Sequence, residues 1–144
     1  MPEHKIIVDV EIEAPPERVF DAWTDPVQLA AWWGDDAVYR TTDWESDARP
    51  GGKWRCQGTG TGDMSGPFKI AGEYTVVERP HRLGFTWSPS WDGGVTTNVL
   101  IELTPTAKGT KLRLTHTGFA TVDSQEAHHE GWKRVLGWLG RHVA

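Results

Sequence analysis

The central part of this chain predicts a long series of strands followed by only one long helix, and this pattern restricts the fold most. The expected strands lie near residues 38–44, 52–58, 68–79, 82–88, 95–104 and 110–117, with turns rich in glycine and proline between them. From about residue 121 to 142 apolar residues recur at helical spacing, with a capping-box variant at Asp123 and Glu126. An antiparallel meander of this length cannot bury both faces by itself, so the helix must cover one of them.

The N-terminal part adds one strand and two short helices. Residues 5–13 alternate between apolar and charged side chains, as in a half-buried strand. Pro15 and Pro16 suit the start of the first helix, whereas Asp25 and Pro26 suit the cap and first turn of the second. The predicted order is β-α-α-β-β-β-β-β-β-α, which we interpret as one α+β domain over residues 1–144.

Composition excludes several classes of partner. The formal net charge is -5 and the Lys and Arg residues are scattered, so the basic stripe that nucleic acid requires is missing. No apolar run approaches the roughly 20 residues that span a bilayer, and no membrane insertion is expected. Cys56 is the single cysteine, which excludes an internal disulfide and favours the cytoplasm. The 9 Trp residues far exceed ordinary usage, so large rings must line or fill an interior.

Short motifs along nearly the whole chain, by their order and separation, indicate a known family. They are Ala14-Pro15-Pro16-Glu17-Arg18-Val19-Phe20, Thr24-Asp25-Pro26 with Trp32-Trp33, Gly72-Glu73-Tyr74, Arg79-Pro80-His81-Arg82-Leu83 with Phe85-Thr86-Trp87, Gly109-Thr110-Lys111-Leu112 with Thr115-His116-Thr117-Gly118-Phe119, and His128-His129-Glu130-Gly131-Trp132 with Leu136 and Leu139. In these motifs the chain resembles the activator of the ninety-kilodalton heat-shock-protein ATPase, in its single-domain homologue form, within the START-like SRPBCC superfamily. The resemblance implies a helix-grip fold, in which a curved antiparallel sheet wraps around a long C-terminal helix and encloses a hydrophobic cavity.

The resemblance implies much less about function than about fold. The superfamily includes lipid and hormone carriers, polyketide cyclases and chaperone activators, and one fold hosts many functions. Two-domain activators carry a separate N-terminal domain that this sequence does not show. The chaperone-stimulating role therefore does not follow from the resemblance.

The candidate cavity residues are mostly aromatic and come from several predicted elements. They are Trp33, Trp54, Cys56, Glu73, Phe85, Trp87, His116, Trp132 and Leu136. For any single Trp, packing in a filled core is an equally good interpretation. Trp32 and Trp33 are adjacent on a predicted helix, so at least one of them is expected at a rim or at the surface.

The polar candidates allow both functional and structural roles. His116 shares the inward strand face with Leu112 and Leu114, where it can orient a ligand or act as an acid or base. The structural alternative is a buried histidine that is hydrogen-bonded to backbone or to Glu73. His128, His129 and Glu130 fan around the helix and cannot hold one ion together, while Gly131 is expected to let the helix approach the sheet closely.

One further pattern is assigned no chemistry. The stretch from Gly58 to Gly66 joins two strands and opens no helix, so it predicts a hairpin loop that can gate a cavity rather than a phosphate-binding loop. We assign no metal, no cofactor and no catalytic residue.

The leading hypothesis is a protein that binds a small hydrophobic or aromatic molecule in an internal cavity, and we favour it over an enzyme. One alternative is a polyketide cyclase or hydrolase-like enzyme that uses the same cavity. Another is a chaperone-associated protein-interaction factor. A homodimer and a chaperone partner both stay open.

Overall fold

The computed structural model describes residues 5–35, 38–60, 67–92 and 95–144. Its elements are β1 (Lys5–Ile12), α1 (Pro16–Thr24), α2 (Pro26–Trp32), β2 (Gly34–Asp35), β3 (Tyr39–Ser46), β4 (Lys53–Gly60), β5 (Pro67–Glu78), β6 (Arg82–Pro89), the 3-10 turn η1 (Ser90–Asp92), β7 (Thr97–Pro105), β8 (Thr110–Thr117) and α3 (Val122–Val143). The loop expected to gate the cavity falls mostly on residues 61–66, outside the described residues.

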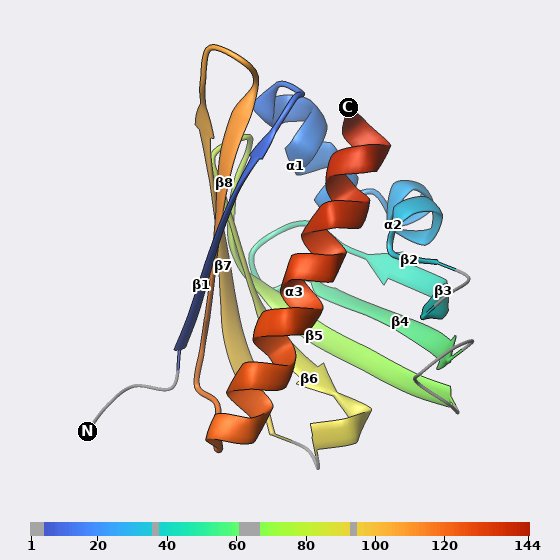
Figure 1. Cartoon of the computed structure of the whole chain (residues 1–144). Helices are drawn as coiled ribbons and strands as arrows, with labels where there is room; N and C mark the ends of the chain where they lie inside the picture. Colours follow the sequence, from blue (N-terminus) through green and yellow to red (C-terminus); the bar gives the residue numbers. More distant parts are fainter. Residues whose placement is uncertain (1–4, 36–37, 61–66, 93–94) are drawn as a thin grey trace.

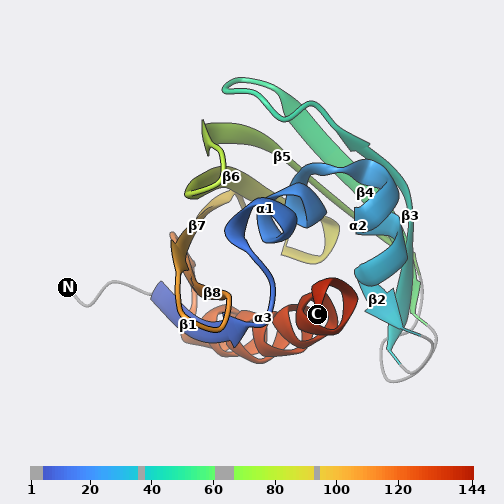
Figure 2. The ribbon, with the colours of Figure 1, turned by 90° about the horizontal axis from the view of Figure 1, so that it is seen from above.

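The strands form one curled antiparallel sheet in the order β1-β8-β7-β6-β5-β4-β3-β2. The pairing register shifts between Thr42 and Glu45 and between Tyr74 and Val76, and such irregularities bend a sheet. Seen from above, the sheet curls around an interior, and α3 lies between its two edge strands (Figure 2). The first two helices lie over one end of this curl, near the C-terminal end of α3 (Figure 1).

The predicted helix-grip architecture and element order are confirmed, with the two-residue β2 as an addition. Asp25 caps α2 as expected, because its side chain accepts a hydrogen bond from Val27 N at 3.0 Å. The expected cap of the last helix was wrong. Thr121 has the extended backbone of an N-cap and its hydroxyl accepts from Ser124 N at 3.0 Å, whereas Asp123 lies inside the first turn.

Hydrogen bonds to α1 and to the edge of the sheet hold α3 in position. Arg18 on α1 donates through Nε to the carbonyl of Val143 at 2.9 Å. At the sheet edge, the indole of Trp138 donates to Asp35 Oδ2 at 2.9 Å. The helix is amphipathic, with Leu136 and Leu139 buried on its inner side. Across the described ranges, no helix combines the length and apolarity needed to cross a membrane.

Candidate functional site

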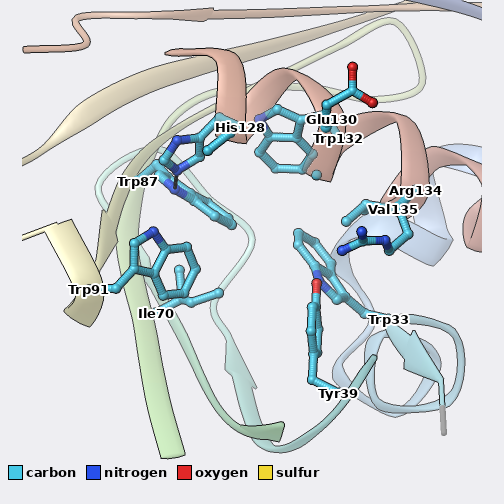
Figure 3. Close-up of a pocket in the computed structure, with 12 residues that line it drawn as sticks. Trp33, Tyr39, Ile70, Trp87, Trp91, His128, Glu130, Trp132, Arg134 and Val135 are labelled. Atoms are coloured by element: carbon cyan, nitrogen blue, oxygen red, sulfur yellow. Dashed lines mark hydrogen bonds between the residues drawn. The ribbon is translucent and has the colours of Figure 1, made fainter. Parts of the chain in front are cut away.

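A cavity of about 210 Å³ lies between the N-terminal half of α3 and the β3 to β6 part of the sheet. Figure 3 shows side chains from helix, sheet and turn arranged around its open centre. The lining residues are Trp33, Tyr39, Ile70, Trp87, Trp91, Ala127, His128, Glu130, Gly131, Trp132, Arg134 and Val135. Trp91 on η1 is 47% exposed, so the aromatic wall reaches the protein surface at this turn.

Two small residues of α3 border the cavity. Ala127 and Gly131 lie one turn apart and both line the space. A Cβ placed on Gly131 would meet no atom within 4 Å. The expectation that Gly131 lets the helix approach the sheet closely was therefore wrong, because this glycine faces empty space.

A pair of hydrogen bonds fixes the imidazole of His128 in the cavity wall. The indole Nε1 of Trp87 donates to His128 Nε2 at 3.1 Å, and His128 Nδ1 lies 2.8 Å from the carbonyl oxygen of Ser124. An indole N–H can only donate, so Nε2 is the acceptor and Nδ1 carries the proton that Ser124 accepts. Both ring nitrogens are therefore occupied in the neutral tautomer.

A second chain of hydrogen bonds lies behind the wall. The indole of Trp132 donates to His116 Nδ1 at 2.9 Å, so the proton sits on Nε2, which donates to Thr97 Oγ1 at 2.5 Å. Thr97 lies 3.4 Å from the carbonyl oxygen of Trp87 and donates to it. Burial, with a smaller contribution from His128, lowers the pKa of His116 to about 3, so this imidazole is neutral.

Three of the nine expected cavity residues line the cavity, namely Trp33, Trp87 and Trp132. His116 is fully buried behind Trp132 and is hydrogen-bonded neither to backbone nor to Glu73. Leu136 is buried, and like His116 it does not line the cavity.

Glu73 and Cys56 both lie elsewhere. Glu73 is exposed on the outer face of β5, because Ile70 and Tyr74 are buried on the inner face and successive side chains of a strand point to opposite faces. Cys56 is buried in the wall of β4, and burial raises the pKa of its thiol to about 12. The thiol is thus protonated and does not act as a nucleophile in the folded protein.

A second aromatic cluster fills the end of the curl beneath α1 and α2. Only about 10 Å³ is empty there, among the side chains of Trp23, Leu29, Trp33, Trp44, Trp54, Tyr74 and Phe85. The two remaining aromatic candidates, Trp54 and Phe85, belong to this cluster and pack edge to face at 5.4 Å. They therefore do not line the cavity of about 210 Å³ next to α3.

Trp32 and Trp33 are both buried, contrary to the expectation that one would lie at a rim or at the surface. Trp33 is the C-cap of α2 and has extended backbone, so its side chain does not follow the helical rotation that would turn it away from Trp32. Trp32 donates to the carbonyl of Ala22 at 2.8 Å, while Trp33 donates to the Tyr39 hydroxyl at 3.1 Å.

Several lining residues were missed in the sequence, including Tyr39, Ile70, Trp91 and Arg134. A signal was present on the helix, where Ala127, Gly131 and Arg134 recur at spacings of four and three residues. Such residues share one face of a helix, and here that face combines two small residues with a cation.

Comparison with known proteins gives the following relationships. The family described as "Activator of Hsp90 ATPase homolog 1-like protein" matches residues 13–144. A structure from Chromobacterium violaceum is similar, with 26% identity, coverage of 99% of this chain and 98% of that chain, and a TM-score of 0.86. An AHSA1-like protein from Aeromonas hydrophila has 30% identity over 96% of this chain and 91% of its own, with a TM-score of 0.78. The AHSA1 protein from Silicibacter pomeroyi has 25% identity over 96% of each chain, with a TM-score of 0.82. A search of the curated proteins gives no match.

Proposed function

We propose that this chain, which belongs to the family of Activator of Hsp90 ATPase homolog 1-like proteins, binds a small and mainly apolar molecule beneath α3. The observation that supports this proposal best is the cavity itself. Its wall combines four indole rings with Ile70 and Val135, and its volume is about 210 Å³. Apolar pockets with a few convergent polar groups are the usual form of small-molecule sites.

The volume limits the size of the occupant. An apolar cavity of roughly 150 Å³ is known to hold benzene, so a space of about 210 Å³ suits one aromatic ring with a short substituent, or two small fused rings. Burial of such a ring contributes about 25 cal/mol per Å² of apolar surface before ordering costs are subtracted. Ring stacking on Trp87 and Trp132 adds a preference for flat molecules.

The hydrogen bonds of the wall favour binding over catalysis. A general base needs a free nitrogen or oxygen within reach of its substrate. In the described part of the cavity wall, both nitrogens of His128 are occupied by Trp87 and Ser124. His116 is separated from the cavity by Trp132 and held neutral. We therefore place binding ahead of a cyclase or hydrolase-like reaction.

The test is titration calorimetry of the purified protein with indole and with indole-3-acetate. We expect binding of at least one of them to the wild-type chain. A Gly131→Leu variant places a side chain into the open space, and binding should fall at least about 10-fold while the protein stays folded, which for a fixed ligand is about 1.4 kcal/mol.

The matched control is Gly137→Leu. Gly137 is also on α3 and also has open space around its Cβ position, but it does not line the cavity. Its binding should equal that of the wild type. Equal affinity of all three proteins would show that the ligand binds elsewhere. Failure of both probes and of a broader panel of aromatic and fatty acids would favour the protein-interaction hypothesis.

A further inference from the structure

Two hydrogen-bond donors lie together on one side of the cavity, where α3 faces β3. Arg134 extends from the helix with its guanidinium directed toward the open centre, and the hydroxyl of Tyr39 lies beside it (Figure 3). Tyr39 is buried, with 9% exposure, whereas Arg134 is exposed to solvent. The charge of Arg134 acts on the Tyr39 hydroxyl, since it is one of the influences that lower the pKa of this group.

Within the described parts of the chain, neither the Tyr39 O–H nor the Arg134 guanidinium has a hydrogen-bond acceptor. Tyr39 Oη accepts from the indole of Trp33 at 3.1 Å, and no acceptor for its own O–H is found there. Burial raises the pKa of Tyr39 to about 12, so the hydroxyl keeps this proton at neutral pH. Arg134 forms no hydrogen bond or ion pair with any described side chain, whereas Lys133 beside it pairs with Glu130. A guanidinium and a hydroxyl therefore both offer protons to the same space.

The acidic groups nearby have other partners. The carboxylate of Glu130 points away from the centre in Figure 3 and lies 3.4 Å from Lys133 Nζ. Asp35 accepts from the indole of Trp138 at 2.9 Å. Asp35 raises the pKa of Tyr39, but by less than Arg134 lowers it. Of these two charges, Arg134 therefore acts more strongly on the Tyr39 hydroxyl.

From this arrangement we infer that the ligand is an aromatic carboxylate, whose ring lies against Trp87 and Trp132 and whose carboxylate binds Arg134 and Tyr39. This inference rests on the proposed function and specifies the class of ligand for that site. A carboxylate accepts two parallel hydrogen bonds from a guanidinium in a bidentate pair, and its remaining lone pairs can accept a further bond from a hydroxyl. A neutral isostere can accept fewer bonds, and an ammonium would meet two donors and a like charge.

The experiment compares three probes of one shape on one protein. Indole-3-acetate, its neutral amide and the cationic tryptamine are titrated by calorimetry at low and high salt. We expect indole-3-acetate to bind about 10-fold more tightly than the amide, because hydrogen bonds to charged groups contribute more than neutral ones. Tryptamine should bind most weakly. The preference for the acid should shrink at high salt, since Arg134 is exposed and its charge is screened.

Variants assign this preference to residues. Arg134→Gln should remove most of the 10-fold preference and its salt dependence while leaving the affinity for the amide unchanged, and Arg134→Lys should restore part of it. Arg141→Gln is the matched control, since Arg141 is an exposed arginine of the same helix that does not line the cavity. Tyr39→Phe should lower acid affinity several-fold.

The outcomes separate the two proposals. If acid and amide bind wild type equally, or if Arg134→Gln keeps the preference, the inference about the carboxylate is wrong while the binding function stands. If only uncharged or fatty-acid ligands of the broader panel bind the wild type, the inference about the aromatic carboxylate fails alone, and if neither the three probes nor that panel binds, both proposals fail.

Discussion

The two ends of the interior are built from the same side chain and yet differ in what they leave empty. Under α1 and α2 the cluster around Trp23 and Trp54 leaves about 10 Å³, whereas the cluster around Trp87 and Trp132 leaves about 210 Å³. Two glycines show the cause. A Cβ on Gly72 would lie 2.5 Å from Trp54 Nε1, so this glycine makes room for a ring that fills the space. Gly131 makes room that no protein atom fills.

The two ends also differ in how their rings are held. At the hollow end the indoles of Trp87 and Trp132 each donate to a histidine ring. Trp33, which borders both ends, donates to Tyr39, and Trp44 of the filled cluster donates to Thr41. The buried indole nitrogens of Trp23 and Trp54, both at the filled end, have no hydrogen-bond partner in the described chain. A ring with packing on all sides needs no further restraint, whereas a ring beside a hole lacks contacts on one side.

The largest expected effect contrasts a ring from each end. Trp23 is 3% exposed and packs edge to face on Trp32 at 5.2 Å, so Trp23→Ala should lower the free energy of unfolding by about 3–5 kcal/mol. Trp91 is 47% exposed, so Trp91→Ala should lower the free energy of unfolding by less than about 1 kcal/mol, although it removes part of the cavity wall. Urea unfolding measures both. Equal losses would mean that the hollow end is as tightly packed as the filled one.

The next effect is a pH dependence of the hydrogen-bonded wall. The pKa of His116 is about 3 in the folded protein, against an ordinary value of 6.5, so between these two values the unfolded chain binds a proton at His116 and the folded chain does not. The contribution of His116 to stability is therefore fully present above the unfolded pKa and is lost as the pH falls toward the folded pKa. Between about pH 7.5 and about pH 5, the free energy of unfolding should fall by about 2 kcal/mol because of this group.

A His116→Gln variant isolates this contribution. His142 also has a lowered pKa, but it is present in both proteins and cancels in the comparison. Unfolding free energies at the two pH values should therefore differ by about 2 kcal/mol less in the variant than in the wild type. Parallel curves for the two proteins would show that His116 is not held neutral by the fold.

A smaller effect tests whether the hole is unstrained. Ala in place of a helical glycine should stabilise by about 0.5–1 kcal/mol, and both Gly131→Ala and Gly137→Ala have room for the added methyl group. Thermal unfolding should show a similar gain in both. A loss at Gly131 alone would indicate that the cavity is narrower than described, and that the two ends differ less than the structure shows.

The smallest expected effect is on the wall of β4. The Cys56 thiol is 2% exposed and its pKa is raised to about 12, so iodoacetamide should leave the native protein unlabelled for as long as it stays folded. Mass spectrometry reads the label, and urea-unfolded protein is the control. Rapid labelling of native protein would show that the sheet opens at β4, beside the cavity-lining Ile70.

The fold could be predicted from the sequence because its signals are local. Asp25 before Pro26 defines a helix start by itself, and alternation along residues 5–13 defines a strand. The site depends instead on distances across the interior. Whether Trp54 or Trp87 borders a hole is decided by the size of side chains on other elements, and alternation along one strand does not contain that information.

Glu73 shows that some of the missed information was present. Ile70 and Tyr74 both face inward on β5, so Glu73, which directly precedes Tyr74, must face outward. The irregularity in strand pairing begins only after Tyr74 and does not affect this alternation. Arg134 and Tyr39 lie 95 positions apart in the sequence, by their residue numbers, and only the closure of α3 over β3 brings them together. No local pattern reports such a pairing.

The place of α3 between the two ends of the sheet also bears on self-association. An open sheet has two edge strands with unpaired backbone groups, which invite pairing with another chain. Here α3 lies beside β1, where Gln125 donates to the Lys5 carbonyl at 3.3 Å, and the opposite edge strand β2 has only two residues. The helix that covers the cavity therefore also protects the edge of the sheet. Loosening α3 would expose a template for aggregation at the same time as it opens the cavity.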